Sequence, residues 1–129
     1  MLAGARLIVA DPRRIMLAKM SDVFLQIRVG SDSALLLAMA HVIAREGLID
    51  EQFMENRTTG GEDFLEHIKE FSPQWAEPIT GVKPQDVETA ALLYGKAGKA
   101  AIYYTLGITE HICGVEKDDE VLVPALAFV

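Results

Sequence analysis

Several residue types that mark particular classes of protein are scarce in this sequence. One cysteine, Cys113, and three histidines provide neither a disulfide framework nor a four-ligand zinc motif. No apolar run approaches the roughly 20 residues that span a bilayer, and no signal peptide pattern is present. Acidic residues outnumber basic ones, giving a net charge of −7. This charge argues against nucleic acid or an anionic membrane as partner, and the cysteine content favours a reducing, cytoplasmic compartment.

The composition otherwise suits one folded domain. The chain has 129 residues, half of them hydrophobic, which is enough for a core. Both ends are apolar, from Leu7 onward and at 125–129. Natural termini are usually polar and solvated, so we expect a piece of a longer polypeptide.

Strand-like and helix-like segments alternate along the chain. Apolar, β-branched runs predict strands, and amphipathic stretches bounded by caps, Gly and Pro predict helices. The alternation favours an α/β layer with a parallel sheet. Strands are expected at 5–10, 23–27 and 100–105, helices at 13–20, 33–46, 50–56, 62–71, 84–96 and from 115 or 120 onward, and a bend at 72–81.

Polar and charged residues gather where each predicted strand ends. They occupy 11–14, 28–32 and 106–111. Ligands of open parallel sheets bind beyond the carboxyl ends of the strands. Residues 1–30 carry a net charge of +3, with Arg6, Arg13, Arg14, Lys19 and Arg28 as the basic residues. This charge favours an anionic ligand, although solvated arginines would give the same pattern.

Two aspartates are candidates for nucleotide contacts. Asp11, directly after a strand, is placed to accept hydrogen bonds from ribose hydroxyls. Asp32, at a helix start, either caps the helix or accepts the two parallel N–H donors of a guanine edge. Neither GxGxxG nor a P-loop occurs.

Catalytic candidates are few. His41 lies within a predicted apolar helix, where packing or contact with a partner is favoured, and His67 is expected to be solvated. His111 and Cys113 are close enough in sequence for a nucleophilic pair, but no orienting acid accompanies them, and a buried thiol is favoured.

The segments ARLIVADPRR, DVFLQIRVGSD and EPITGVKPQDVETAALLYGKAGKAAIYYTLGITEH resemble the molybdopterin oxidoreductase family. The similarity runs from about Gly4 to Gly114 and is greatest to the catalytic alpha subunits of molybdenum- or tungsten-dependent formate dehydrogenases. It implies that 1–129 is a single Rossmann-like, three-layer α/β domain with a short, mainly parallel sheet and flanking helices. This domain would hold part of a bis(molybdopterin guanine dinucleotide) cofactor.

The resemblance assigns cofactor contacts to three segments. Val9, Ala10, Asp11, Pro12 and Arg13 would line one dinucleotide. Gly30, Ser31 and Asp32 would hold its guanosine end, with Asp32 recognising guanine. Leu106, Gly107 and Glu110 would approach the pterin. Glu110 departs from the glutamine common in relatives, and an acid there is unfavourable beside an anionic cofactor unless it is neutralised. The acidic run 116–120 also departs from the family pattern.

The family's metal-ligating Cys or selenocysteine, catalytic His and iron–sulfur motif match nothing in this chain. The resemblance therefore implies no catalytic residue here and no activity for the chain alone. Its partners would be the rest of its own polypeptide and electron-transfer subunits. The alternatives are a stand-alone, non-catalytic nucleotide-binding module and an interaction domain.

Overall fold

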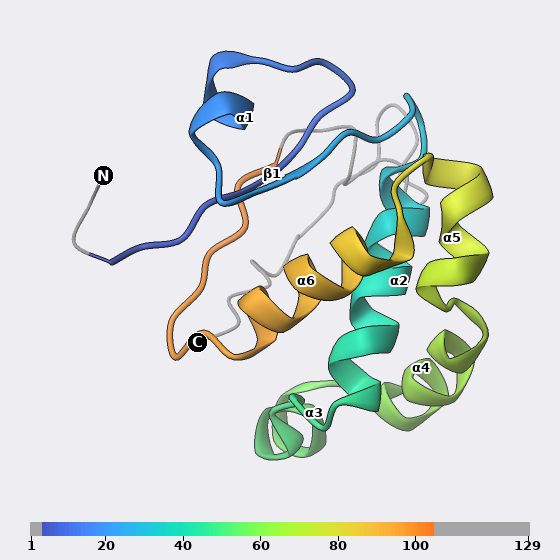
Figure 1. Cartoon of the computed structure of the whole chain (residues 1–129). Coiled ribbons are helices and arrows are strands. Elements are labelled where there is room, and N and C mark those ends of the chain that lie inside the picture. Colours follow the sequence, from blue (N-terminus) through green and yellow to red (C-terminus); the bar gives the residue numbers. More distant parts are fainter. Residues whose placement is uncertain (1–3, 105–129) are drawn as a thin grey trace, which may run out of the picture. The chain divides into compact units, whose positions relative to one another are not determined.

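The computed structural model describes residues 4–104 of the 129. The chain divides into two compact units, Met1–Lys96 and Ala97–Val129. The described helices and strands all lie in the first unit, and residues 97–104 contain neither. In chain order they are β1 (Ile8–Ala10), α1 (Met16–Met20), β2 (Val23–Leu25), α2 (Asp32–Arg45), α3 (Glu51–Arg57), α4 (Gly61–His67), the 3-10 helix η1 (Ile68–Glu70), α5 (Pro73–Thr80) and α6 (Pro84–Gly95) (Figure 1).

The two strands form a parallel pair. Ile8 lies opposite Val23 and Ala10 opposite Leu25. A parallel pair needs a crossover of about a dozen residues, and the connection between Ala10 and Val23 contains α1, which packs against both strands. The predicted α/β class is thereby confirmed, with a two-stranded parallel sheet and flanking helices.

Helix α2 is the centre of the helical part. It packs against α5, α6 and η1, and α6 also contacts β2 (Figure 1). Ala38, Ala76 and Ala90 are fully buried, and these small side chains allow the helices to approach closely. The core joins sheet and helices through Leu25, Leu35, Ala38, Ala76, Val82, Val87 and Ala90.

Within residues 72–81, Pro73–Thr80 form helix α5, so the predicted bend is wrong. Ser72 caps the helix by accepting a hydrogen bond from the Trp75 N–H at 3.2 Å. Pro73 occupies the first turn, where a missing N–H costs nothing. Pro78 lies inside the helix, but buried Ala76 and Thr80 secure the helix, which packs against α2. Tertiary packing therefore outweighs the local effect of proline.

The predicted third strand is also wrong over its described part, because residues 100–104 have no strand conformation. Local β-propensity does not make a strand without a neighbour that completes its hydrogen-bond ladder. Thr105 and the predicted C-terminal helix lie outside the described residues. Within residues 4–104, no helix has the length and apolar character needed to cross a membrane.

Candidate functional site

The predicted ligand-binding segments follow two neighbouring strands. Since Ala10 and Leu25 pair at the ends of parallel β1 and β2, the loops after them leave from the same edge of the sheet. The Asp11 N–H donates to the Leu25 carbonyl at 3.3 Å. Gln26 Nε2 donates to the Pro12 carbonyl at 3.0 Å. The two loops are thus tied together at their bases.

The first loop is shaped by Asp11. Its Oδ1 accepts the Arg13 N–H at 2.7 Å and lies 3.6 Å from Arg13 Nε. This Asx turn reverses the chain after β1. The Asp11 side chain is 22% exposed and that of Arg13 82% exposed. The Arg13 guanidinium is therefore exposed to solvent at the edge where the carboxyl ends of β1 and β2 lie, here called the carboxyl edge. Val9, within β1, is buried.

The second loop turns at Gly30, whose φ of +78° lies in the left-handed region that favours glycine. Ser31 is buried and occupies the N-cap position, and its carbonyl accepts the Leu35 N–H at 3.1 Å. Its hydroxyl does not cap the helix but donates to the Arg28 carbonyl at 2.7 Å. Asp32 is the first helical residue, so its interpretation as an N-cap is wrong. A carboxylate in the first turn of α2 is favoured by the helix dipole.

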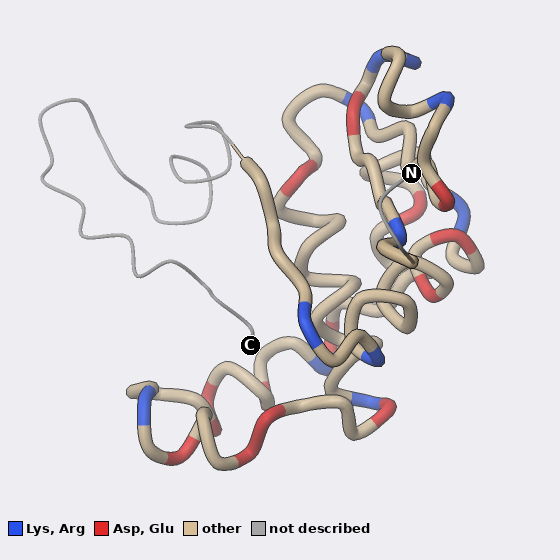
Figure 2. The backbone as a smooth tube through the Cα atoms, turned by 90° about the vertical axis from the view of Figure 1, so that its left-hand side faces the viewer, with Lys and Arg blue, Asp and Glu red and all other residues tan. Residues whose placement is uncertain are grey.

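Only some of the arginines in residues 1–30 lie where the predicted strands end and could meet an anionic ligand. Arg6 pairs with Asp22 at 3.3 Å, and Asp22 precedes β2, at the amino edge of the sheet. Arg28 donates to backbone carbonyls of α5. Arg13 and Arg14 remain at the carboxyl edge, and both are exposed. Figure 2 shows basic residues in the upper part of the tube and again in its lower part, with acidic residues between them.

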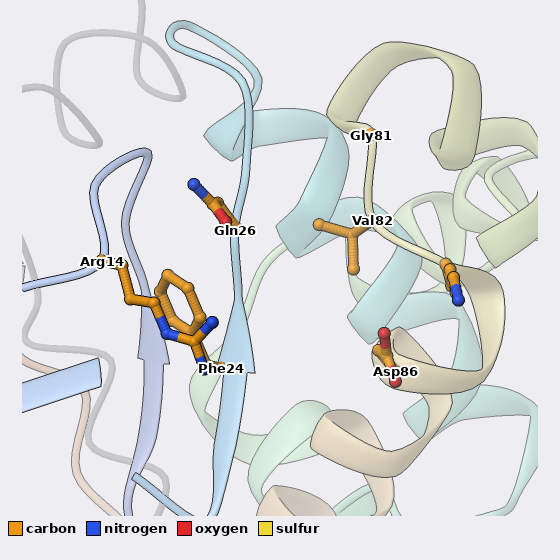
Figure 3. A pocket seen from close by; sticks show the side chains of 7 residues that line it. Arg14, Phe24, Gln26, Gly81, Val82 and Asp86 are labelled. Atoms are coloured by element: carbon orange, nitrogen blue, oxygen red, sulfur yellow. The ribbon is translucent and has the colours of Figure 1, made fainter. Parts of the chain in front are cut away.

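A hollow of about 350 Å³ opens beside the end of β2. The Arg14 guanidinium lies 5.8 Å from the centre of the Phe24 ring, within the range of a cation–π contact. In Figure 3, Arg14 and Phe24 form one side of the hollow and Val82 and Asp86 the other, with Gln26 between them. Its lining is Arg14, Phe24, Gln26, Gly81, Val82, Lys83 and Asp86.

Sequence reasoning found Arg14 but missed the other polar residues of this hollow. Phe24 and Gln26 are two positions apart along β2 and its extension, so their side chains lie on the same face. This spacing could have indicated from the sequence that the two side chains line one site. Lys83 and Asp86 lie at the start of α6, and nothing local indicates that α6 begins beside β2. Gly30, Ser31 and Asp32 do not line the hollow.

The remaining candidates divide between structural residues and undescribed ones. His41 Nδ1 is 3.0 Å from the Ile68 carbonyl, and this contact joins α2 to η1. His67 is exposed, as predicted, with its ring edge-on to Phe71. Among residues 4–104, no group of His, Cys, Asp and Glu could hold a metal. Leu106, Gly107, Glu110, His111 and Cys113 lie outside the described residues.

No family model matches the chain. It is 45% identical over 113 residues to an F420-dependent formate dehydrogenase subunit alpha of Methanocaldococcus jannaschii, covering 88% of this chain and 17% of the relative. Formate dehydrogenase H of Escherichia coli is 41% identical, with 88% and 16% covered. The solved acetylene hydratase of Pelobacter acetylenicus superposes with a TM-score of 0.77 at 36% identity, over 81% of this chain and 14% of that one.

This chain belongs to the molybdopterin oxidoreductase family. It spans about one sixth of the length of the curated relatives it matches. A nitrate reductase of Symbiobacterium thermophilum, at 38% identity, is also among them. Within the family the names thus cover formate, nitrate and acetylene chemistry.

Proposed function

We propose that this chain is the segment of a molybdopterin-dependent formate dehydrogenase that holds one part of a bis(molybdopterin guanine dinucleotide). Formate is favoured because four formate dehydrogenases match 88% of this chain at 34–45% identity, three of them at 40% or more. The nitrate reductase and an acetylene hydratase are 38% identical over 84% and 77% of the chain. The observation that carries the proposal is the common origin of the Asp11–Arg13 and Gly30–Asp32 loops at one sheet edge.

The residues at this edge suit such a cofactor. A carboxylate at Asp32 accepts hydrogen bonds only, which matches the donor pair of guanine. A Cβ placed on Gly30 would meet no atom within 4 Å, so the space beside the turn is open. Arg13 is exposed, and its fork of donors matches phosphate oxygens. Val9 and Ala10 end β1, and Pro12 lies in the loop that follows it. Ser31, which is buried, anchors the second turn.

When bound, the cofactor supplies the redox metal, molybdenum or tungsten, that takes two electrons as formate becomes carbon dioxide and a proton. This chain's own part is to hold and orient the nucleotide end. We assign the metal ligand, an iron–sulfur cluster and the catalytic groups to other parts of a longer, cytoplasmic polypeptide. Leu106, Gly107 and Glu110 are proposed to reach the pterin. The relatives' designation as alpha subunits supports electron-transfer subunits as partners.

The first test is made on the native polypeptide that contains this sequence. We expect a chain several times longer than 129 residues that carries molybdenum or tungsten and extractable pterin, measured by intact mass, elemental analysis and fluorescence. A native chain of this length without metal or pterin would contradict the proposal and leave a stand-alone nucleotide-binding module.

Asp32→Ala tests the nucleotide contact in the same protein. We expect cofactor retention to fall while the free energy of unfolding changes by no more than about 1 kcal/mol, the value of a first-turn carboxylate. The control is Asp63→Ala, which removes an aspartate from the first turn of α4. Equal cofactor content in the two variants would show that Asp32 does not contact the nucleotide.

A further inference from the structure

Arg28 occupies the segment between β2 and the turn that begins α2. Its guanidinium Nη1 donates to the carbonyls of Pro78 and of Ile79, the latter at 3.2 Å. Its backbone N–H donates to the Thr80 carbonyl at 2.9 Å. One residue therefore satisfies three consecutive carbonyls of α5, from a position about fifty residues earlier in the chain.

These carbonyls belong to the end of a helix. The last four carbonyls of a helix have no partner within it, and in α5 the Gly81 N–H takes only that of Glu77, at 2.8 Å. A positive charge at this end is also favoured by the helix dipole. Gly81, with φ +77°, turns the chain beside the guanidinium, where a Cβ would lie 3.5 Å from Arg28 Cζ. Arg28 thus completes the cap of α5.

The other side of Arg28 holds the Gly30–Asp32 turn. Its carbonyl accepts the Ser31 N–H at 3.2 Å and the Ser31 hydroxyl at 2.7 Å. Ser31 is 4% exposed, so water competes little for these two bonds. The start of α2, and with it Asp32, is therefore fixed through Arg28 to the end of α5.

We propose that Arg28 is a positioning residue that fixes the cofactor-binding turn Gly30–Asp32 relative to α5 and does not bind phosphate itself. The proposal rests on the proposed function of that turn. Because the Arg28 side chain is exposed, water can replace its bonds to α5, and losing them costs the fold little. The turn, however, loses the side-chain part of its connection to α5 and keeps the bond from the Arg28 backbone N–H to the Thr80 carbonyl. A recognition carboxylate that is held less firmly binds its partner less well.

The test uses the full-length protein and three variants. Arg28→Gln removes the charged fork, and Arg28→Lys keeps a cationic donor. Thr80→Val is the matched control at the same corner. It removes the bonds of the buried Thr80 hydroxyl to the Ala76 carbonyl and the Val82 N–H, at 2.9 and 3.1 Å, but leaves the Arg28 contacts in place. For each protein, the rate of pterin release on dilution and the unfolding temperature are measured.

We expect Arg28→Gln to release pterin roughly tenfold faster than the parent, the low end of the effect of residues that orient ligands. Thr80→Val should lower the unfolding temperature at least as much with unchanged release, and Arg28→Lys should restore part of the retention. Release rates that simply follow unfolding temperature across the variants would overturn the positioning role alone. A parent protein without pterin would overturn the proposed function, and the positioning role with it.

Discussion

At the scale of single residues, the environment of Tyr94 sets its acidity. Tyr94 lies on α6, and burial raises the pKa of its phenol above the ordinary value because the charged phenolate would be poorly solvated. The unfolded chain has a tyrosine pKa of about 10. Above that pH the unfolded state loses the proton before the folded state does, so the unfolded state binds fewer protons and stability falls as pH rises.

Tyr94→Phe should therefore flatten the alkaline side of the stability profile. Between about pH 9 and 11 the parent should lose unfolding temperature more steeply than the variant, since only the parent carries the shifted phenol. Thermal melts across that range measure the two slopes, with Tyr103→Phe as the control because Tyr103 is 95% exposed. Parallel slopes for Tyr94→Phe and the parent would contradict the assignment.

At the scale of elements, the end of α5 depends on a backbone conformation. Gly81 adopts φ +77° directly after the helix and donates its N–H to the Glu77 carbonyl. A Cβ in this left-handed region crowds the following carbonyl, and asparagine tolerates the region better than alanine.

Gly81→Ala should destabilise the protein by about 1–2 kcal/mol, and Gly81→Asn by less. The order of the two variants is the informative result, because asparagine is the larger residue and steric crowding alone would reverse it. Chemical denaturation of both variants gives the comparison.

At the scale of the whole first unit, one core joins the sheet to the helices. Leu25 is fully buried where β2 meets α6 and α2. Removing its side chain leaves a cavity whose walls come from separate elements and cannot all move inward together.

Leu25→Ala should therefore cost about 2–5 kcal/mol of unfolding free energy. The matched variant is Leu17→Ala in α1, where the leucine is 54% exposed in this chain, and its effect should stay near zero in the 129-residue chain. Urea denaturation measures both. Similar losses would mean that Leu25 does not lie in the core described above.

Local signals in the sequence determined much of this molecule. Gly47 and Pro84 set the end of α2 and the start of α6 to within a residue or two, because their backbone restrictions act wherever the chain goes. The polar residues after the first two predicted strands lie, as expected, in loops that leave from one edge of the sheet. Hydrophobic periodicity and helix capping are properties of a few consecutive residues, so they act in the same way in the folded protein.

The tertiary structure decided those features that depend on contacts between residues far apart in the sequence. Helix α5 forms despite the internal Pro78 because it packs on α2. Residues 100–104 form no strand despite their β-propensity. The five-residue strand expected from Val23 onward ends at Leu25. Arg28 looked like a phosphate ligand until α5 brought its carbonyls to the guanidinium from fifty residues away. Such contacts are set by where distant segments meet, and no local pattern encodes that meeting.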